Sequence, residues 1–332
     1  MTRPGLGVDS DVRLSLLDRS RTRAGHPDAE GLTGSVARAV WAEELGYDRF
    51  WVAEHHAVPG IASGAPPVLM AAVGAATSRI RIGSGGIMLP HHQPIVVAEQ
   101  VRMLEALHPG RVDVGLGRSS GFTAPVREAL RETPDAADRF ADDVRELRDL
   151  MAGRGAVTVR PAGGPVPVYL LATGRGVTLA AELGLPVVVG GPALWSDELP
   201  SALVAYRRDF RPSPDADAPE VLVSLDVLVA DDVATARELA LPEAWAMAQS
   251  RRTGVFGPLE SPAAIRAQEW PEQVRRRVET SLEQAVAGDA GAVRRTLEQL
   301  AERTGADELL ASTSTWDRDA LRAADAALRA LV

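Results

Sequence analysis

Residues 77–118 read TSRIRIGSGGIMLPHHQPIVVAEQVRMLEALHPGRVDVGLGR. The two ends of this stretch, 80–87 and 111–117, are short runs of apolar and small residues, as expected of strands that are buried on both faces. Between them, 94–107 repeats its apolar residues with the period of an amphipathic helix. Parallel strands need a crossover of this kind, so the stretch predicts a strand–helix–strand unit.

The same rhythm continues along the chain. We expect strands at 12–17, 48–54, 80–87, 111–117, 166–172, 186–190, 221–229 and 307–312. We expect helices at 33–45, 65–77, 94–107, 135–152, 176–184, 196–209, 233–250 with 271–287, 289–304 and 317–331. Eight such units without a central linker predict an α/β fold of the (β/α)8 TIM barrel class, with residues 1–332 forming one domain.

Three segments interrupt this rhythm with glycine, proline, serine and aspartate: 118–134, 211–219 and 251–262. Loops of such length on a compact barrel are usually functional or disordered. We expect the first and third to be extended loops at the C-terminal face that form a lid over the barrel mouth. The second is so polar that we expect a plain surface loop.

Composition excludes several classes of function. The chain has 36 basic and 45 acidic residues, and no basic cluster that would follow a phosphate backbone, so we expect no nucleic-acid partner. It has no cysteine, which excludes disulfides, thiolate nucleophiles and cysteine-based metal centres. No apolar run approaches the ~20 residues of a membrane-spanning helix, and the first residues lack an apolar signal core. We therefore expect a cytoplasmic protein without a membrane partner.

Four of the six histidines lie in two adjacent pairs. His55 and His56 follow the second predicted strand in WVAEHHAVPG, 51–60, and His91 and His92 follow the third in LPHHQPIV, 89–96. Active sites of barrel enzymes gather at the carboxyl ends of the strands. Because the two strands are neighbours, we expect both pairs to reach the same rim.

The four rings invite different interpretations. His55 stands beside Glu54 at a strand end, where an imidazole can exchange a proton near neutral pH, so we assign it acid–base or ligand-orienting work. For His56 and His91 we favour hydrogen bonds to the backbone of the loops at the barrel mouth.

A metal site is a second hypothesis for these histidines. Adjacent residues on an extended chain point to opposite faces, so His55 and His56 do not easily chelate one ion. One histidine from each pair with Glu54 would make a two-histidine, one-carboxylate site. A barrel metallohydrolase needs further ligands on later strands, where the chain offers only Asp226, Asp307 and Glu308. We therefore predict that no metal is bound.

Two small-residue turns suit an anion. GLGRSSG, 115–121, ends the fourth strand and contains Arg118, which can bind a phosphate group through two hydrogen bonds. LLATGRGVTLAAELGLP, 170–186, passes from strand to turn to helix. Its turn offers a hydroxyl, backbone N–H groups, a guanidinium and a helix N-terminus, from Thr173, Gly174, Arg175 and Gly176. Strands four and five are neighbours in a barrel, so we expect one phosphorylated ligand to bind both turns.

A third small-residue stretch, GSGGIMLP at 83–90, places three glycines within a predicted strand. Glycine weakens a strand unless the backbone must bend or something must approach it closely. A flat ring lying over Gly85 and Gly86 would provide that reason.

Taken in order, several of these strings resemble the bacterial luciferase-like flavin-dependent monooxygenases. They are LGYDRFWVAEHH at 45–56, the whole of 77–118, AAELGLP at 180–186 and TGADELLASTS at 304–314. The resemblance extends over most of 12–317 and is greatest to the single-chain alkanal-monooxygenase-like branch, some members of which serve natural-product biosynthesis.

The resemblance implies an FMNH2-dependent, two-component monooxygenase on a (β/α)8 barrel. In this family a separate NAD(P)H:flavin reductase supplies reduced FMN, which binds with its ring in the barrel mouth. The reduced flavin reacts with O2 to form a C4a-peroxyflavin, and this oxygenates a small organic substrate. The resemblance also implies a homodimer.

The resemblance also assigns roles to residues. It makes His55 the catalytic histidine that assists proton transfer and stabilises the peroxyflavin. It places a non-proline cis peptide at Gly85–Gly86, and it implies phosphate binding by Arg118 and by the turn that carries Thr173. The cofactor-binding residues we predict are Glu54, Gly85, Gly86, His92, Arg118, Thr173, Gly174, Arg175 and Gly176.

The chain departs from the family pattern at three points. Where relatives have two serines after the fifth strand, this chain has ATGRG, which resembles the TGPR-like turn of the deazaflavin branch. Arg175 therefore favours the alternative of a deazaflavin (F420)-dependent oxidoreductase that transfers hydride. In LPHHQP the family-like position is His92, and SSG at 119–121 replaces Ala-Pro-Gly, which indicates a different substrate pocket. A further alternative is a relative that binds flavin but has no catalytic activity. Such a protein would not need His55, which this chain retains.

Overall fold

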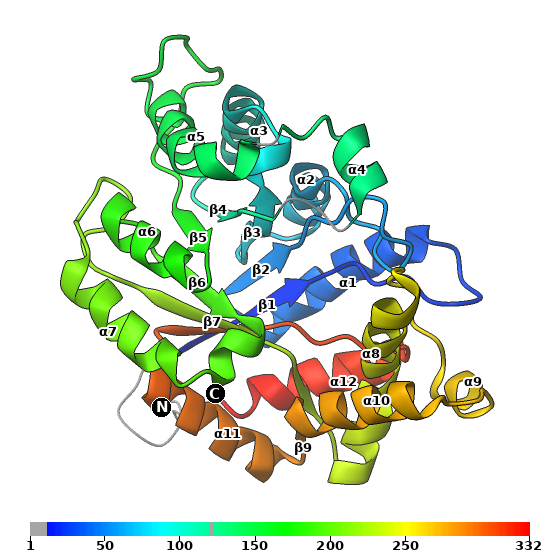
Figure 1. Ribbon diagram of the computed structural model, residues 1–332. Coiled ribbons are helices and arrows are strands. Elements are labelled where there is room, and N and C mark those ends of the chain that lie inside the picture. The colour runs from blue at the N-terminus through cyan, green and yellow to red at the C-terminus, as the bar shows by residue number, and fades with distance from the viewer. Residues whose placement is uncertain (1–11, 120–122, 134) are drawn as a thin grey trace.

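A computed structural model describes residues 12–119, 123–133 and 135–332 (Figure 1). In this part of the chain, eight parallel strands close into a barrel in the order β1-β10-β7-β6-β5-β4-β3-β2. The barrel strands are β1 Arg13–Asp18, β2 Arg49–Val52, β3 Arg81–Met88, β4 Val112–Gly117, β5 Val168–Leu171, β6 Val187–Gly190, β7 Val221–Leu225 and β10 Glu308–Ala311. The predicted (β/α)8 barrel is thus confirmed.

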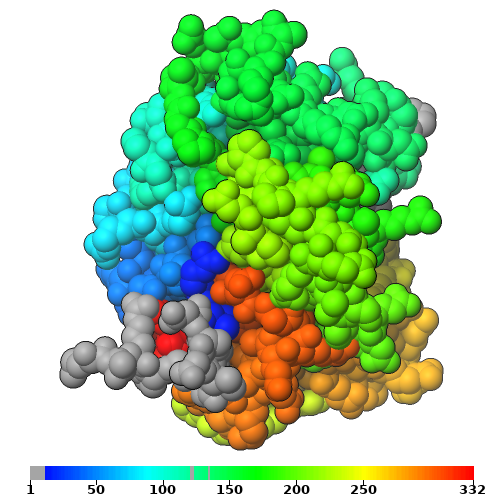
Figure 2. Space-filling view, turned by 90° about the vertical axis from the view of Figure 1, so that its left-hand side faces the viewer, coloured from blue at the N-terminus to red at the C-terminus, as the bar shows by residue number. Residues whose placement is uncertain are grey.

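Helices surround the barrel (Figure 1). They are α1 Ala29–Leu45, α2 Pro66–Ala76, α3 Pro94–Leu107, α5 Ala136–Met151, α6 Arg175–Leu183, α7 Glu198–Asp209, α11 Ala290–Thr304 and α12 Arg318–Arg329. These agree with the predicted helices to within a few residues at the ends. Figure 2 shows one flank of the ring, where α11, in orange, lies against α7, in yellow-green.

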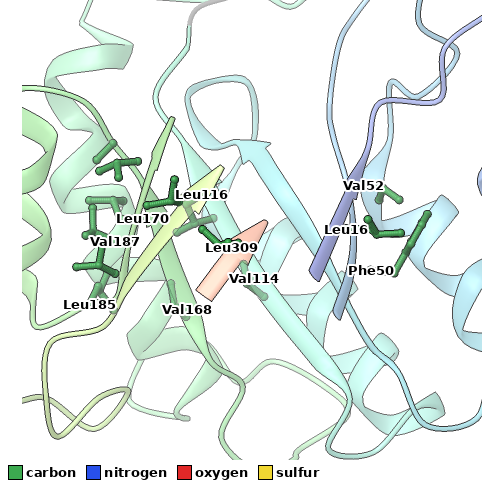
Figure 3. Packing of buried hydrophobic residues seen from close by; sticks show 14 of the residues in the cluster. Leu16, Phe50, Val52, Val114, Leu116, Val168, Leu170, Leu185, Val187 and Leu309 are labelled. Carbon is green, nitrogen blue, oxygen red and sulfur yellow. The ribbon is translucent and has the colours of Figure 1, made fainter. Parts of the chain in front are cut away.

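Alternation along the strands separates two apolar layers. On β2, Phe50 and Val52 point outward to the helices, whereas Trp51 points into the barrel. Figure 3 shows ten labelled residues of the outer layer, among them Leu16, Phe50 and Leu309. Each fully buried side chain of this size contributes about 1.5–3 kcal/mol, so this layer is what fixes the helices to the barrel. The interior layer consists of Leu17, Trp51, Ala53, Tyr169, Val188, Leu222 and Leu310.

A charged network fills the N-terminal end of the barrel interior. The guanidinium of Arg49 lies between Asp113, 2.7 Å away, and Glu308, 3.0 Å away, and all three side chains are buried. Arg81 and the indole N–H of Trp51 also donate hydrogen bonds to Asp113. Charges removed from water must be paired, and here each one is.

The predicted strand 221–229 is wrong at its centre. β7 ends at Leu225, and the residues after Asp226 form a separate strand, β8 Val227–Val229. β8 leaves the barrel and pairs in parallel with β9 Val286–Gly288. The predicted helix 271–287 ends early for the same reason: α10 Glu272–Gln284 stops so that the next residues can form β9.

The interrupting segments contain short helices that the sequence did not indicate. α4 Ala124–Ala129 lies within 118–134, and α9 Pro262–Arg266 follows the irregular residues after α8 Val233–Thr253. Gly254 follows the last residue of α8 and caps the helix, and its φ of 76° is one that glycine adopts without strain. Residues 120–122 and 134 lie outside the described residues. The lid remains a prediction. In the described ranges, no helix has both the length and the apolarity needed to cross a membrane.

Candidate active site

His55 lies at the barrel mouth, just beyond the carboxyl end of β2. It lines a cavity of about 480 Å³ together with Gly85 on β3 and with Leu17 and Arg19 at the end of β1. Burial lowers the pKa of His55 to about 4, and the positive charge of Arg19 acts in the same direction. The imidazole is therefore neutral at pH 7.

The two histidine pairs reach the same rim, as the sequence predicts, and Glu54 connects them. Glu54 is 1% exposed, and its Oε1 accepts hydrogen bonds from Nε2 of His56 at 2.6 Å and of His92 at 2.8 Å. Its Oε2 accepts the backbone N–H of Met88 at 3.1 Å. Burial raises the pKa of Glu54, but the hydrogen bonds from His92 and His56 outweigh burial and hold the pKa below its usual value.

This arrangement differs from what we expected of His56 and His91. His56 bonds to a carboxylate instead of loop backbone, because Glu54 stands two residues before it and is the stronger acceptor. His91 packs its ring edge-on against His56, with 5.7 Å between ring centroids. In the described part of the chain, neither ring nitrogen of His91 has a hydrogen-bond partner.

The second predicted cluster also comes together. Arg118, Thr173, Arg175 and Gly176 line a cavity of about 550 Å³ at the ends of β4 and β5. Arg118 is held by a hydrogen bond from its Nε to the carbonyl oxygen of Ala137, 3.0 Å away. Two arginines and a threonine thus line one space, a set of residue types that suits a phosphate group.

The turn itself is tighter than the sequence suggested. Gly174 has a φ of 52°, and the N–H of Gly176 donates to the carbonyl oxygen of Thr173 at 3.0 Å. That N–H is therefore engaged inside the turn. Thr173 and Arg175, which carry the hydroxyl and the guanidinium of the turn, are both exposed residues.

The two cavities adjoin. Ser224 lines both, and the neighbouring residues Gly190 and Gly191 line the second and the first respectively. Ligand sites of proteins usually measure about 300–1,000 Å³, so the pair can hold one elongated ligand with an anionic end and a flat end. We call the 480 Å³ cavity the ring cavity and the 550 Å³ cavity the phosphate cavity.

Gly85 and Gly86 on β3 have different surroundings. The peptide bond between Gly85 and Gly86 is cis, as the resemblance implies. Gly85 faces the ring cavity, where a Cβ would lie 2.6 Å from the Cδ1 of Leu17. A Cβ on Gly86 would lie 2.8 Å from the carbonyl oxygen of Gly115 on β4. Of the predicted cofactor-binding residues, Glu54, Gly86 and His92 line neither of these two cavities.

Sequence reasoning missed a group of three charged side chains in the ring cavity. Arg19 forms an ion pair with Asp226 and a longer one, 3.3 Å, with Glu243 on α8. All three residues line the cavity. The signal was available only in part, because Asp226 was embedded in an apolar run and Arg19 followed the first strand without a recognisable motif.

Comparisons with known proteins identify the family and support the fold. A (β/α)8 barrel whose mouth carries these two cavities defines a class of ligand-binding barrel enzymes. Residues 12–319 match the family model described as luciferase-like monooxygenase, and the chain belongs to that family.

Individual relatives support the assignment. The chain is 36% identical over 319 residues to a luciferase-like monooxygenase of Escherichia coli (strain K12), covering 94% of this chain and 95% of that one. It is similar to the crystal structure of apo-MsnO8, with a TM-score of 0.85 and 31% identity over 96% of this chain and 97% of that chain.

Two more distant structures share the fold alone. One is the oxygenating constituent of 3,6-diketocamphane monooxygenase from Pseudomonas putida, in complex with FMN (TM-score 0.73, 17% identity, 96% of both chains). The other is an F420-dependent secondary alcohol dehydrogenase in complex with an F420–acetone adduct (TM-score 0.68, 18% identity, 94% of this chain and 98% of that one).

Proposed function

We propose that this protein is an FMNH2-dependent, two-component monooxygenase that oxygenates a small organic substrate. The observation that carries the proposal is the junction of the two cavities. Arg118, Thr173 and Arg175 line the phosphate cavity, and His55 and Gly85 line the adjoining ring cavity. A phosphorylated flavin has matching parts, and one distant structural neighbour contains FMN.

The residues present fit a flavin mononucleotide. The guanidiniums of Arg118 and Arg175 and the Thr173 hydroxyl would hold the phosphate. Gly85 lines the ring cavity without a side chain of its own, and we propose that a flat ring lies against this wall. When bound, the reduced flavin supplies the oxygen chemistry; the chain supplies position, orientation and exclusion of water.

His55 is the group of this chain that we assign to proton transfer. Its neutral ring shares the ring cavity with Gly85 and Ser224, so it lies close to the space that a ring and a substrate would share. Glu54, through its bonds to His56 and His92, ties the loop after β2 to the loop after β3. We propose that this tie positions His55, and that Glu54, Gly86 and His92 support the cofactor site from behind.

The outer part of the ring cavity supports a largely apolar substrate. Leu194, Trp195, Leu225 and Met247 form its walls, and the Arg19–Asp226–Glu243 group supplies one polar edge. Such a cavity suits an organic molecule with one hydrogen-bonding end.

We propose that the reduced flavin comes from a separate NAD(P)H:flavin reductase. Thr173 and Arg175 are exposed residues that line the phosphate cavity, so a flavin can enter and leave without unfolding of the barrel, whereas Gly174 lies in the same turn but does not line the cavity. We also propose a homodimer in which α2 and α3 pack against a second copy. Val68 on α2 and Met103 and Leu107 on α3 are exposed apolar residues on these two helices, which contact each other.

Arg175 supports the second candidate, an F420-dependent oxidoreductase that transfers hydride. It adds a second guanidinium to the phosphate cavity, which suits a ligand more anionic than FMN. A distant structural neighbour is F420-dependent.

Anaerobic titration with reduced FMN and with reduced F420, monitored by fluorescence, distinguishes the two candidates. We expect tighter binding of reduced FMN, and a loss of affinity in Arg118→Ala. Tight binding of F420 with no saturable binding of reduced FMN would replace the first candidate by the second. Saturable binding of neither would contradict both.

A further inference from the structure

Among the described residues, the Glu54–His56–His92 cluster has a geometry that the positioning role proposed above does not use. One carboxylate oxygen and one ring nitrogen from each histidine lie within 4.8 Å of one another. We propose that these three residues bind a divalent transition-metal ion of the zinc class at the rim of the barrel. This inference does not depend on the proposed flavin chemistry.

The donor set selects the class of ion. Two imidazoles and one carboxylate suit Zn²⁺ and its first-row neighbours, whereas Mg²⁺ and Ca²⁺ prefer shells built of oxygen atoms. The chain has no cysteine that would favour a softer ion. Zn²⁺ is therefore the probe that the cluster fits best.

The present hydrogen bonds mark where an ion would bind. The Nε2 atoms of His56 and His92 lie 2.6 Å and 2.8 Å from the same oxygen of Glu54. In a tetrahedral zinc shell with bonds of about 2.0–2.2 Å, neighbouring ligand atoms are about 3.3 Å apart. To reach this spacing, the Nε2 atoms would move away from the Glu54 oxygen by about 0.5–0.7 Å. Each neutral ring then carries its proton on Nδ1 and presents the Nε2 lone pair to the ion.

The cluster is both anchored and accessible. Glu54 is buried, and its other oxygen is held by the backbone N–H of Met88. The side chains of His56 and His92 are 22% and 25% exposed, which leaves a path from solvent. Support of a ligand from behind is typical of metal sites, because it fixes the donor before the ion arrives.

A separate observation indicates that the cluster is incomplete. His91 lies against His56, and among the described residues neither of its buried ring nitrogens has a hydrogen-bond partner. Buried polar atoms are normally satisfied, so this ring is poised for a ligand. Within this proposal, His91 is the candidate for the fourth donor of the shell.

The position of the site argues for binding and against a hydrolytic centre. A metallohydrolase needs ligands on later strands, and Glu308 lies at the opposite end of the barrel, bonded to Arg49. The donors found here come only from the loops after β2 and β3. An ion at this point would lock the two loops together beside His55.

Calorimetric titration of the chelator-treated full chain with Zn²⁺ tests the proposal. We expect saturable binding of one ion per chain and a rise in Tm. In His92→Gln and in His56→Gln the affinity should fall at least about tenfold, since even residues behind a metal shell cost about 10–100-fold when removed. The matched control is His26→Gln, which removes a partly exposed histidine away from the cluster and should bind as the parent does.

Two results would overturn the proposal: no saturable binding by the parent chain, or equal affinity in the parent and both cluster variants. Should the variants fail to fold, ¹H–¹⁵N spectra of the histidine rings in the parent chain decide. Zn²⁺ must then shift two or three ring signals and leave those of His26 and His108 unchanged. Shifts confined to His26 or His108 would show adventitious binding at the surface.

Discussion

The two ends of the barrel interior treat polar groups in opposite ways. At the N-terminal end, Arg49, Asp113 and Glu308 are buried and bonded to one another. At the C-terminal mouth, buried nitrogen atoms of Arg19 and His91 have no hydrogen-bond partner among the described residues. One end is closed and stabilises the fold. The other keeps unsatisfied groups that a ligand can satisfy.

Electrostatics explains why both arrangements coexist. A buried charge is tolerated only when it is paired, so the closed end needs all of its partners at once. At the mouth, the cavities admit water and ligands, so partners need not come from the chain. We therefore expect substitutions at the closed end to act on stability, and substitutions at the mouth to act on binding.

The largest effect is expected from Asp113→Ala. It removes the buried carboxylate that pairs with Arg81 and leaves Arg49 with Glu308 alone, and breaking a buried pair costs about 3–5 kcal/mol in the free energy of unfolding. Urea denaturation measures this loss. The control is Asp142→Ala, which removes an exposed ion pair with Arg145 and should cost less than about 1 kcal/mol. Equal losses in the two variants would refute the distinction.

A smaller effect, on binding alone, is expected from Arg118→Ala at the mouth. A hydrogen bond to a charged group contributes about 1.5–3 kcal/mol, so the Kd for reduced FMN should rise by about 10–100-fold. Stability should change by less than about 0.5 kcal/mol, because Arg118 is half exposed. Arg139→Ala on α5 is the control, and an equal loss of affinity there would exclude a specific role for Arg118.

The smallest effect concerns pH and belongs to neither end of the barrel interior, but to a contact between α1 and the residues that precede β3. Burial raises the pKa of Glu43, but hydrogen bonds from the backbone N–H groups of Ile80, Arg79 and Ser78 outweigh burial and lower the pKa to about 2. A carboxyl group with a lowered folded-state pKa stabilises the fold above its unfolded value, near 4.5, and this contribution is lost as the pH falls towards 2.

Glu43→Gln should therefore be less stable than the parent by about 1 kcal/mol at pH 7, a figure reduced for screening at a partly exposed site. The difference should shrink between about pH 4.5 and pH 2. Urea midpoints at several pH values measure it. A difference that stays constant over this range would show that the carboxylate charge has no part in the effect.

Periodicity was sufficient to predict the barrel, because each strand alternates or is wholly apolar and each helix follows the 3.6-residue period. Periodicity failed at 221–229, where one apolar run forms strands of two different sheets. Nothing in the letters of 221–229 marks the point where β7 ends and β8 leaves the barrel. β9 escaped notice because three residues are too few to interrupt a helical pattern.

The residues of the candidate site likewise fall into two groups: those that the sequence could place at the barrel mouth, and those whose contacts it could not predict. Positions that follow a strand end, such as His55 and Arg118, could be assigned to the mouth from the fold alone. Contacts between distant segments could not: Arg19 meets Glu243 across more than two hundred residues, and only the closed barrel brings them together. The shared acceptor of His56 and His92 likewise needed three-dimensional positions, because the sequence does not say which way Glu54 turns.

The most direct test of the proposed function is the reaction of the reduced FMN complex with oxygen. The complex is formed without oxygen, mixed rapidly with oxygenated buffer, and followed by the return of oxidised-flavin absorbance. We predict a long delay in the parent chain and a short one in His55→Ala, with reduced-FMN affinity similar in both. If flavin bound to the parent chain reoxidises as fast as free reduced flavin, or if His55→Ala keeps the full delay, the role proposed for His55 is wrong.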